Sequence, residues 1–193
     1  MEEMGINEMG LSKIPLKRNC PAKKLQEEPA IFSLAWLIIS DTHEKTDNLA
    51  VLLKRYAYQV QGVLHLGDHD YDLLQFADTY ALPLYTVAGN CDDESLSPRE
   101  RVVTLGGHRV FMAHGDRYNV GMGTNRILQR ARAQEAVVCL YGHTHISACE
   151  ETDGILLMNP GSLTEPRDDN PPAYGLLTLD ADTQTFSGRI MHV

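Results

Sequence analysis

The first half of the chain alternates short apolar runs with amphipathic stretches. Residues 36–39 form a continuous apolar run, which is typical of a strand buried on both faces. Helical spacing follows, with Thr46 or Asp47 as the N-cap and an inward stripe of Leu49, Leu52, Leu53 and Tyr56. The same order recurs in a strand at residues 63–66, a helix with the stripe Leu73, Leu74, Ala77 and Tyr80, and a strand at residues 84–88. This repetition predicts parallel strands joined by right-handed crossovers.

The second half is richer in strands. Residues 102–105 and 109–113 flank Gly106 and Gly107, and this pattern predicts a hairpin whose glycines adopt positive φ. A helix is predicted over residues 124–133, with an inner face of Ile127, Leu128 and Ala131. Further strands are predicted at residues 137–141, 155–158, 174–179 and 185–191. We therefore predict an α/β fold of two packed mixed β-sheets flanked by helices.

Polar side chains stand just past the carboxyl ends of these predicted strands. They are Asp41, His43, Asp68, Asn90, His114, His143 and His145. Ligands bind at the carboxyl ends of strands in α/β sheets, so we expect these side chains to converge on one rim. His143 and His145 are two residues apart, and in an extended segment both imidazoles point to the same side.

The donor atoms of this set are imidazole nitrogens and carboxylate or amide oxygens, a mixture that suits Mn, Fe, Zn or Ni. Seven ligands are too many for one tetrahedral ion, but they suit two ions that share a bridging carboxylate. The remaining histidines are interpreted differently. His65 lies within a strand and is expected to be a core residue with satisfied hydrogen bonds, whereas His108 and His192 are expected on the surface.

Composition narrows the range of functions. The chain has 193 residues, of which 43% are hydrophobic and 22% charged, as expected of one globular domain. A net charge of −9 argues against an extended nucleic-acid surface or an acidic membrane surface. No apolar run of membrane-spanning length occurs, so no membrane association is expected. The four cysteines show no paired spacing and predict reduced thiols in a cytoplasmic protein.

The N-terminal residues differ from the rest of the chain. Residues 1–29 carry five acidic residues, five basic residues and three prolines, with no apolar core pattern. We predict a flexible N-terminal extension over residues 1–30 and one domain over residues 31–193. A start codon assigned upstream of the true one would give the same pattern.

Five ordered motifs resemble the signature of the calcineurin-like metallophosphoesterases. They are Asp41-x-His43, Gly67-Asp68, Gly89-Asn90, His114-Gly115 and Gly142-His-x-His145, and the resemblance covers residues 36–193. The short chain and the segments 89–92 and 159–162 are similar to small bacterial and archaeal phosphodiesterases of the YfcE type. The resemblance implies a four-layer α/β/β/α sandwich.

The resemblance also implies a role for each candidate residue. Asp41, His43 and His145 would hold one divalent ion, Asn90, His114 and His143 a second, and Asp68 would bridge them. Manganese is the expected metal, with nickel, iron and zinc as alternatives. Two such ions neutralise a phosphodiester and lower the pKa of a shared water, so that a bridging hydroxide attacks phosphorus. Asp68, Asn90 and His114 are the expected catalytic residues, with the Asn90 amide donating to a phosphoryl oxygen.

Two departures from the family pattern concern the proton donor to the leaving group and the charge around the substrate. Many relatives place a histidine after the motif asparagine, where this chain has Cys91 followed by Asp92. The proton donor to the leaving group therefore stays open between Cys91, Asp92, His69 and water. Glu44 and Asp116 add negative charge beside the motifs, and Arg117 and Arg167 are the compensating cations.

The expected function is hydrolysis of small phosphodiesters. The alternatives are a phosphomonoesterase and a protein-binding scaffold that resembles the small retromer subunit. A nuclease or a dinucleoside polyphosphate hydrolase is disfavoured by the acidic surface. An exposed edge strand in the second half could support a homodimer.

Overall fold

The computed structural model describes residues 34–193. The flexible extension expected over residues 1–30 lies outside the described residues, so that expectation and the domain boundary stay predictions. Two five-stranded sheets make up the framework of the described part. None of the helices in residues 34–193 is long and apolar enough to cross a membrane.

The first sheet has the strand order β10-β9-β1-β2-β3. Its strands are β1 (Leu34–Ile39), β2 (Val63–His65), β3 (Leu84–Thr86), β9 (Ala173–Leu179) and β10 (Phe186–His192). Strands β1, β2 and β3 are parallel, as the repeated strand and helix pattern predicts. Strand β9 runs antiparallel between β1 and β10, so the sheet is mixed.

The second sheet has the order β4-β5-β6-β8-β7. Its strands are β4 (Glu100–Leu105), β5 (His108–Ala113), β6 (Val138–Leu140), β7 (Ala148–Thr152) and β8 (Ile155–Asn159). Strands β5, β6 and β8 are parallel, while β4 and β7 are antiparallel edge strands. The predicted hairpin between β4 and β5 is confirmed, and Gly106 and Gly107 have φ of 54° and 87°.

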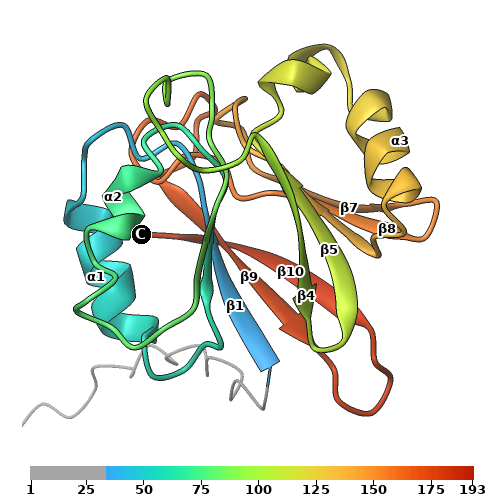
Figure 1. The fold of residues 1–193 in the computed structure, drawn as a ribbon, viewed down its shortest axis with the longest axis horizontal. Coiled ribbons are helices and arrows are strands. Elements are labelled where there is room, and N and C mark those ends of the chain that lie inside the picture. The colour runs from blue at the N-terminus through green and yellow to red at the C-terminus, as the bar shows by residue number, and fades with distance from the viewer. Residues whose placement is uncertain (1–33) are drawn as a thin grey trace, which may run out of the picture. The chain divides into compact units, whose positions relative to one another are not determined.

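The helices cover the outer faces of the two sheets (Figure 1). Helix α1 (Asp47–Tyr56) packs against the first sheet, α3 (Asn125–Ala133) packs against the second, and the stripes predicted for both are buried. The short helix α2 (Tyr71–Leu74) and the 3-10 turns η1 (Asp116–Tyr118) and η2 (Val120–Met122) complete the set in this part of the chain. The predicted two-sheet α/β fold with four layers is therefore confirmed.

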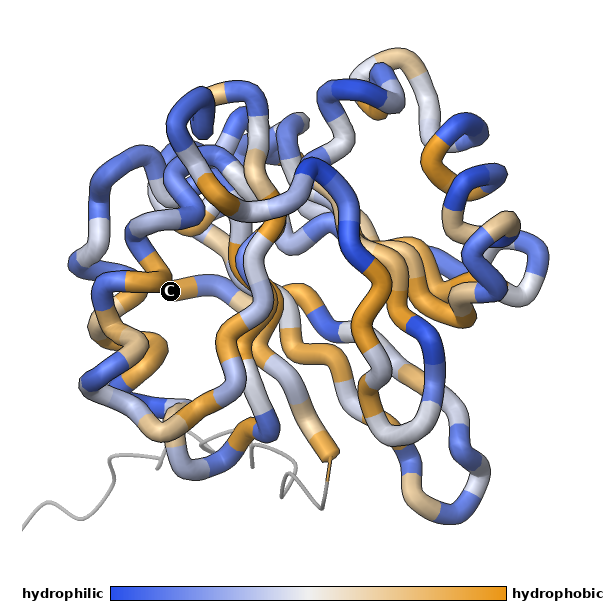
Figure 2. The backbone as a smooth tube through the Cα atoms, viewed as in Figure 1, coloured by the Kyte–Doolittle hydropathy of each residue, from blue (hydrophilic) through white to orange (hydrophobic). Residues whose placement is uncertain are grey.

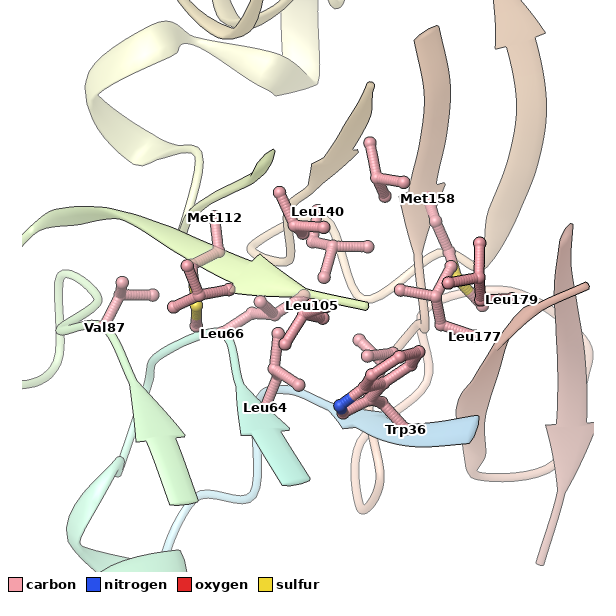
Figure 3. Packing of buried hydrophobic residues seen from close by; sticks show 14 residues of the cluster. Trp36, Leu64, Leu66, Val87, Leu105, Met112, Leu140, Met158, Leu177 and Leu179 are labelled. Atoms are coloured by element: carbon pink, nitrogen blue, oxygen red, sulfur yellow. The ribbon is translucent and has the colours of Figure 1, made fainter. Parts of the chain in front are cut away.

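Alternation along β1 explains how the layers are held together. Trp36 and Ile38 belong to the cluster between the two sheets, in which Figure 3 labels Trp36, whereas Leu37 and Ile39 belong to the cluster on the α1 side. Because both faces of this strand are buried, it reads as a continuous apolar run in the sequence. Figure 2 shows the hydrophobic positions gathered along the strands, with hydrophilic positions in the loops at the upper edge.

Two elements differ from the prediction. The second predicted helix is only four residues long, and the chain continues in turns, in which the N–H groups of Phe76, Ala77 and Thr79 bond to carbonyls three residues back. Asp78 and Thr79 are weak helix formers, and Pro83 follows closely. Strand β7 was not predicted, because it is an exposed edge strand without apolar alternation. The missed signal is the turn dipeptide Asp153-Gly154, whose φ values are 52° and 78°.

Candidate metal centre

The seven candidate residues all follow the carboxyl ends of strands. Asp41 and His43 follow β1, and Asp68 and Asn90 come after β2 and β3 of the same sheet. The second sheet supplies the rest, with His114 directly after β5 and His143 and His145 after β6. The loops that carry these residues gather at the upper edge of the view in Figure 1.

Four of these residues form one tight group. Ligand atoms of Asp41, His43, Asp68 and His145 all lie within 4.8 Å of one another. His145 Nε2 lies 3.1 Å from Asp41 Oδ1 and 3.3 Å from His43 Nε2, and His43 Nε2 lies 4.0 Å from Asp68 Oδ2. Asp41, Asp68 and His145 are buried and His43 is half-buried, so the group sits at the floor of the loops.

A second pair adjoins this group through the same carboxylate. His114 Nε2 lies 3.4 Å from Asp68 Oδ2 and 3.2 Å from His143 Nδ1. Asp68 Oδ2 is therefore close to both His43 and His114. One carboxylate oxygen is thus close to donors of both groups, which is compatible with a bridging role.

The Asn90 side chain is the most exposed of the seven candidates. It is exposed, and among the described residues its amide nitrogen donates to Cys91 Sγ at 3.4 Å. The neighbouring Cys91 N–H donates to Asp68 Oδ1 at 2.9 Å, so the loop itself reaches the shared carboxylate. The expected role of Asn90 as a ligand stays a prediction.

Hydrogen bonds to backbone carbonyls fix the direction of two imidazoles. The Nδ1–H of His114 donates to Leu66 O at 2.8 Å, and the Nδ1–H of His145 donates to Glu165 O at 2.6 Å. With Nδ1 bonded to a carbonyl, each Nε2 is directed at a carboxylate oxygen, where it can bind either a proton or a metal ion. Asp41 Oδ1 is buried and has no hydrogen-bond partner among the described residues. Imidazole nitrogens and carboxylate oxygens this close together need a proton or a cation between them, and the donor set fits divalent ions.

The pKa shifts of the candidate ligands also indicate a site that attracts positive charge. Burial acts to lower the pKa of His114 and His145, but Asp68 and Asp41 outweigh it and raise the pKa of both imidazoles. Burial acts to raise the pKa of Asp68, yet hydrogen bonding with His114 and Cys91 brings it well below its usual range. The pKa of His143 is lowered by burial and by the charge on His114. The carboxylates thus draw positive charge to the places where the ligand atoms meet.

Sequence comparison decides the family. The family model for the calcineurin-like phosphoesterase superfamily domain matches residues 34–182. The chain belongs to this superfamily. Probable metallophosphoesterase YsnB of Bacillus subtilis (strain 168) is 32% identical to this phosphoesterase over 149 residues, which cover 77% of the chain and 86% of the relative.

Two further comparisons concern a named activity and a solved fold. Phosphodiesterase YfcE of Escherichia coli (strain K12) is 31% identical over 102 residues, which cover 49% of this phosphoesterase and 52% of the relative. The crystal structure of a predicted phosphoesterase from Streptococcus pneumoniae TIGR4 matches with a TM-score of 0.70 and 25% identity. That match covers 82% of this chain and 89% of the other.

Strained backbone is concentrated in the candidate centre of this phosphoesterase. Five of the candidate ligands have left-handed φ: Asp41 (55°), His43 (46°), Asp68 (58°), His143 (69°) and His145 (60°). Each such residue costs on the order of 1–3 kcal/mol, and Asp and His tolerate the conformation better than most residues. The strain persists because neighbouring groups hold the loops in place.

The motif glycines are required by close approach of the loops. A Cβ on Gly89 would lie 2.5 Å from Asp68 N and 2.9 Å from His114 Cγ. A Cβ on Gly142 would overlap Ser40 Oγ and lie 2.9 Å from Asp41 Oδ2. Any larger residue at these positions would push apart the loops that carry the candidate ligands.

Several residues that hold the candidate ligands were not recognised as such in the sequence. Ser162 Oγ donates to Asp41 O at 2.8 Å, and Thr164 Oγ1 donates to the same carbonyl at 3.1 Å. Asn159 Nδ2 donates to Gly142 O at 2.9 Å, ahead of the two histidines. In the sequence, the sharp turn at residues 159–162 was the signal that could have identified these supporting residues.

His65 is a buried core residue with both ring nitrogens in hydrogen-bond contact, as expected.

The candidate proton donors differ in their surroundings. Burial and nearby carboxylates raise the pKa of Cys91 to about 11, so its thiol keeps its proton at neutral pH. Asp92 is buried and its carboxylate accepts backbone N–H groups on both oxygens. The His69 ring lies 5.4 Å from the His43 ring, with its Nδ1 3.7 Å from Glu44 Oε1.

The backbone N–H of Arg167 donates to His145 O at 3.1 Å, so Arg167 borders the candidate metal centre.

Proposed function

We propose that this phosphoesterase hydrolyses small phosphodiesters with the help of two divalent ions. Asp41, His43 and His145 would hold the first ion, and His114 and His143 would hold the second, with Asn90 turning toward it. Asp68 would bridge the two. The observation that carries the proposal is the Asp68 carboxylate, whose Oδ2 lies 3.4 Å from His114 Nε2 and 4.0 Å from His43 Nε2. We expect manganese from the likeness to the family, and the imidazole nitrogens and carboxylate oxygens also suit nickel, iron or zinc.

When bound, two divalent ions would neutralise the charge of the phosphodiester and lower the pKa of a water. The protein's own groups prepare the site for that chemistry. Asp68 is ionised throughout the neutral range because its pKa is well below its usual value. The backbone carbonyls of Leu66 and Glu165 hold His114 and His145 in the orientation that ligation needs. The exposed Asn90 amide is available to donate to a phosphoryl oxygen.

The leaving group would take its proton from water or from His69. The Asp92 carboxylate already accepts N–H groups on both oxygens, and the Cys91 thiol has a pKa of about 11. His69 is half-buried at the rim and has a neighbouring carboxylate on Glu44. Preference for diesters over monoesters is supported by the likeness to the E. coli relative named a phosphodiesterase.

Turnover of chromogenic esters tests the proposal. Wild-type protein with added Mn²⁺ is expected to hydrolyse bis-p-nitrophenyl phosphate faster than p-nitrophenyl phosphate. Asp68→Asn should lower that rate by roughly 100-fold or more, because the bridging charge is lost. Asp153→Asn in the exposed β7–β8 turn is the matched control and should retain the wild-type rate.

Other results would favour the alternatives. Faster turnover of the monoester would make the protein a phosphomonoesterase. No Mn²⁺-dependent turnover, together with stable capture of a partner protein, would favour the protein-binding scaffold. The cytoplasmic location and the homodimer stay predictions. For the homodimer the exposed edge strand β7 is the candidate contact, and light scattering with a Glu150→Pro variant tests it.

A further inference from the structure

The carboxylate of Asp92 is bound by backbone N–H groups from two neighbouring loops. Its Oδ2 accepts from Asp68 N at 2.8 Å and Gly89 N at 2.7 Å. Its Oδ1 accepts from His69 N at 2.7 Å and Asp70 N at 3.2 Å. The side chain is buried, so these N–H groups replace the water that a carboxylate would otherwise bind. Both acceptor oxygens are in use, which explains why Asp92 holds no position open for substrate.

Three of the donors are consecutive and form an anion-binding concavity. Asp68 and His69 have φ of 58° and 69°, and such turns point successive N–H groups toward one place. Concavities of this kind bind phosphates and other anions in many proteins. Here the anion belongs to the chain itself. A negative charge at this place offsets the cost of two successive left-handed residues without glycine.

The segment that carries Asp92 binds both the backbone N–H and the side-chain carboxylate of Asp68. The Asp92 side chain binds the backbone N–H of Asp68, and the backbone N–H of Cys91 binds Asp68 Oδ1 at 2.9 Å. Asp68 Oδ2 is then left facing His43 and His114. A second tie joins the same loops, since Ser95 Oγ donates to Asp70 Oδ2 at 2.8 Å and Ser97 Oγ also donates there.

We propose that Asp92 is a positioning residue, whose carboxylate serves as an internal anion that fixes the Asp68 carboxylate between two metal ions. The inference rests on the proposed dinuclear centre. Asp92 does not touch substrate or metal in this account. It acts through the backbone of residues 68–70, and it explains why the chain carries aspartate immediately after the Asn90-Cys91 pair.

Metal binding to an isosteric variant tests this role. Asp92→Asn keeps one acceptor oxygen and places an NH₂ group against two N–H donors, so the loop must shift. Asp93→Asn removes the same charge from the adjacent exposed position and is the matched control. Wild-type protein and Asp93→Asn are expected to bind two Mn²⁺ ions with the electron paramagnetic resonance spectrum of a spin-coupled pair. Asp92→Asn should bind the second ion roughly 10–100-fold more weakly and lose the coupled spectrum.

A rescue experiment separates positioning from general loss of structure. Asp92→Ala leaves space for a small carboxylate, so added formate should restore the coupled spectrum in this variant and leave wild-type protein unchanged. Circular dichroism of the metal-free variants should give folded spectra. The inference would be overturned if Asp92→Asn bound Mn²⁺ with wild-type affinity and gave the spin-coupled spectrum. It would also be overturned if formate did not restore the coupled spectrum of Asp92→Ala, including the case in which that variant does not fold. Failure of wild-type protein to bind two ions would instead refute the proposed function on which the inference rests.

Discussion

Acid should destabilise the native protein through His65, which is fully buried in β2. Its Nδ1 accepts the N–H of Gly67 at 3.1 Å, and its Nε2 lies 3.1 Å from Thr42 Oγ1. A proton added to Nδ1 would face the Gly67 N–H, and the charge would have no water around it. Burial, partly offset by Asp41 and Asp70, therefore lowers the pKa of His65 from 6.5 to about 4.

The sign and size of the effect follow from proton linkage. Between pH 6.5 and 4 the unfolded chain binds a proton at this position that the native protein does not bind, so the free energy of unfolding falls as the pH falls. A pKa of 6.5 in the unfolded chain and about 4 in the native protein corresponds to a loss of about 2 kcal/mol at pH 5 and about 3 kcal/mol at pH 4.

Urea unfolding at several pH values measures this loss. His65→Gln removes the titrating group and retains a donor directed at Thr42, and His108→Gln at the β4–β5 hairpin is the matched control. All three proteins, the wild type and the two variants, are studied with a chelator, so that metal release does not contribute. From pH 7.5 to pH 5 the wild type and the control should each lose about 2 kcal/mol more than His65→Gln. Equal losses in all three proteins would refute the reasoning that burial keeps His65 neutral.

Three further predictions concern the loops, the core and the metals. Gly89→Ala should weaken Mn²⁺ binding by at least about 10-fold in titration calorimetry, because the added Cβ would overlap Asp68. Gly121→Ala is the control, since its Cβ would meet nothing within 4 Å. Equal Mn²⁺ affinities of the two variants would contradict the expectation. Ile38→Ala should lower the free energy of unfolding in urea by about 2–5 kcal/mol. Val51 is exposed, so Val51→Ala should change that free energy by less than about 1 kcal/mol. Similar losses in the two variants would argue against the packed interface between the sheets. Mn²⁺ at a hundredfold excess over its Kd should stabilise the protein by about 2.7 kcal/mol per site in thermal unfolding, and an equal shift in Asp68→Asn would count against a shared carboxylate.

Periodicity in the sequence was sufficient to predict most of the layered fold. The stripe from Leu49 to Tyr56 is buried as expected, and β1 is apolar throughout because both of its faces are covered. Strand β7 escaped this reasoning since its side chains at Cys149, Glu150 and Glu151 are exposed and carry no burial signal. Helix α2 was predicted too long because an apolar stripe does not show where turns replace a helix.

The candidate centre was predictable as a set of residues and less so as a geometry. The position of each residue after a strand identified the rim, since parallel strands end at the same edge. The contact between Asp68 of the first sheet and His114 of the second depends on how the sheets pack, which no local pattern encodes. The role of Asp92 was hidden for the same reason, because its four donors lie on two loops separated in sequence.

Anomalous diffraction from crystals grown with Mn²⁺ would show whether Asp68 is shared between two metal ions. We expect two peaks, one among Asp41, His43 and His145 and one beside His114 and His143, with the Asp68 carboxylate between them. A single peak, or two peaks that do not share Asp68, would contradict this expectation.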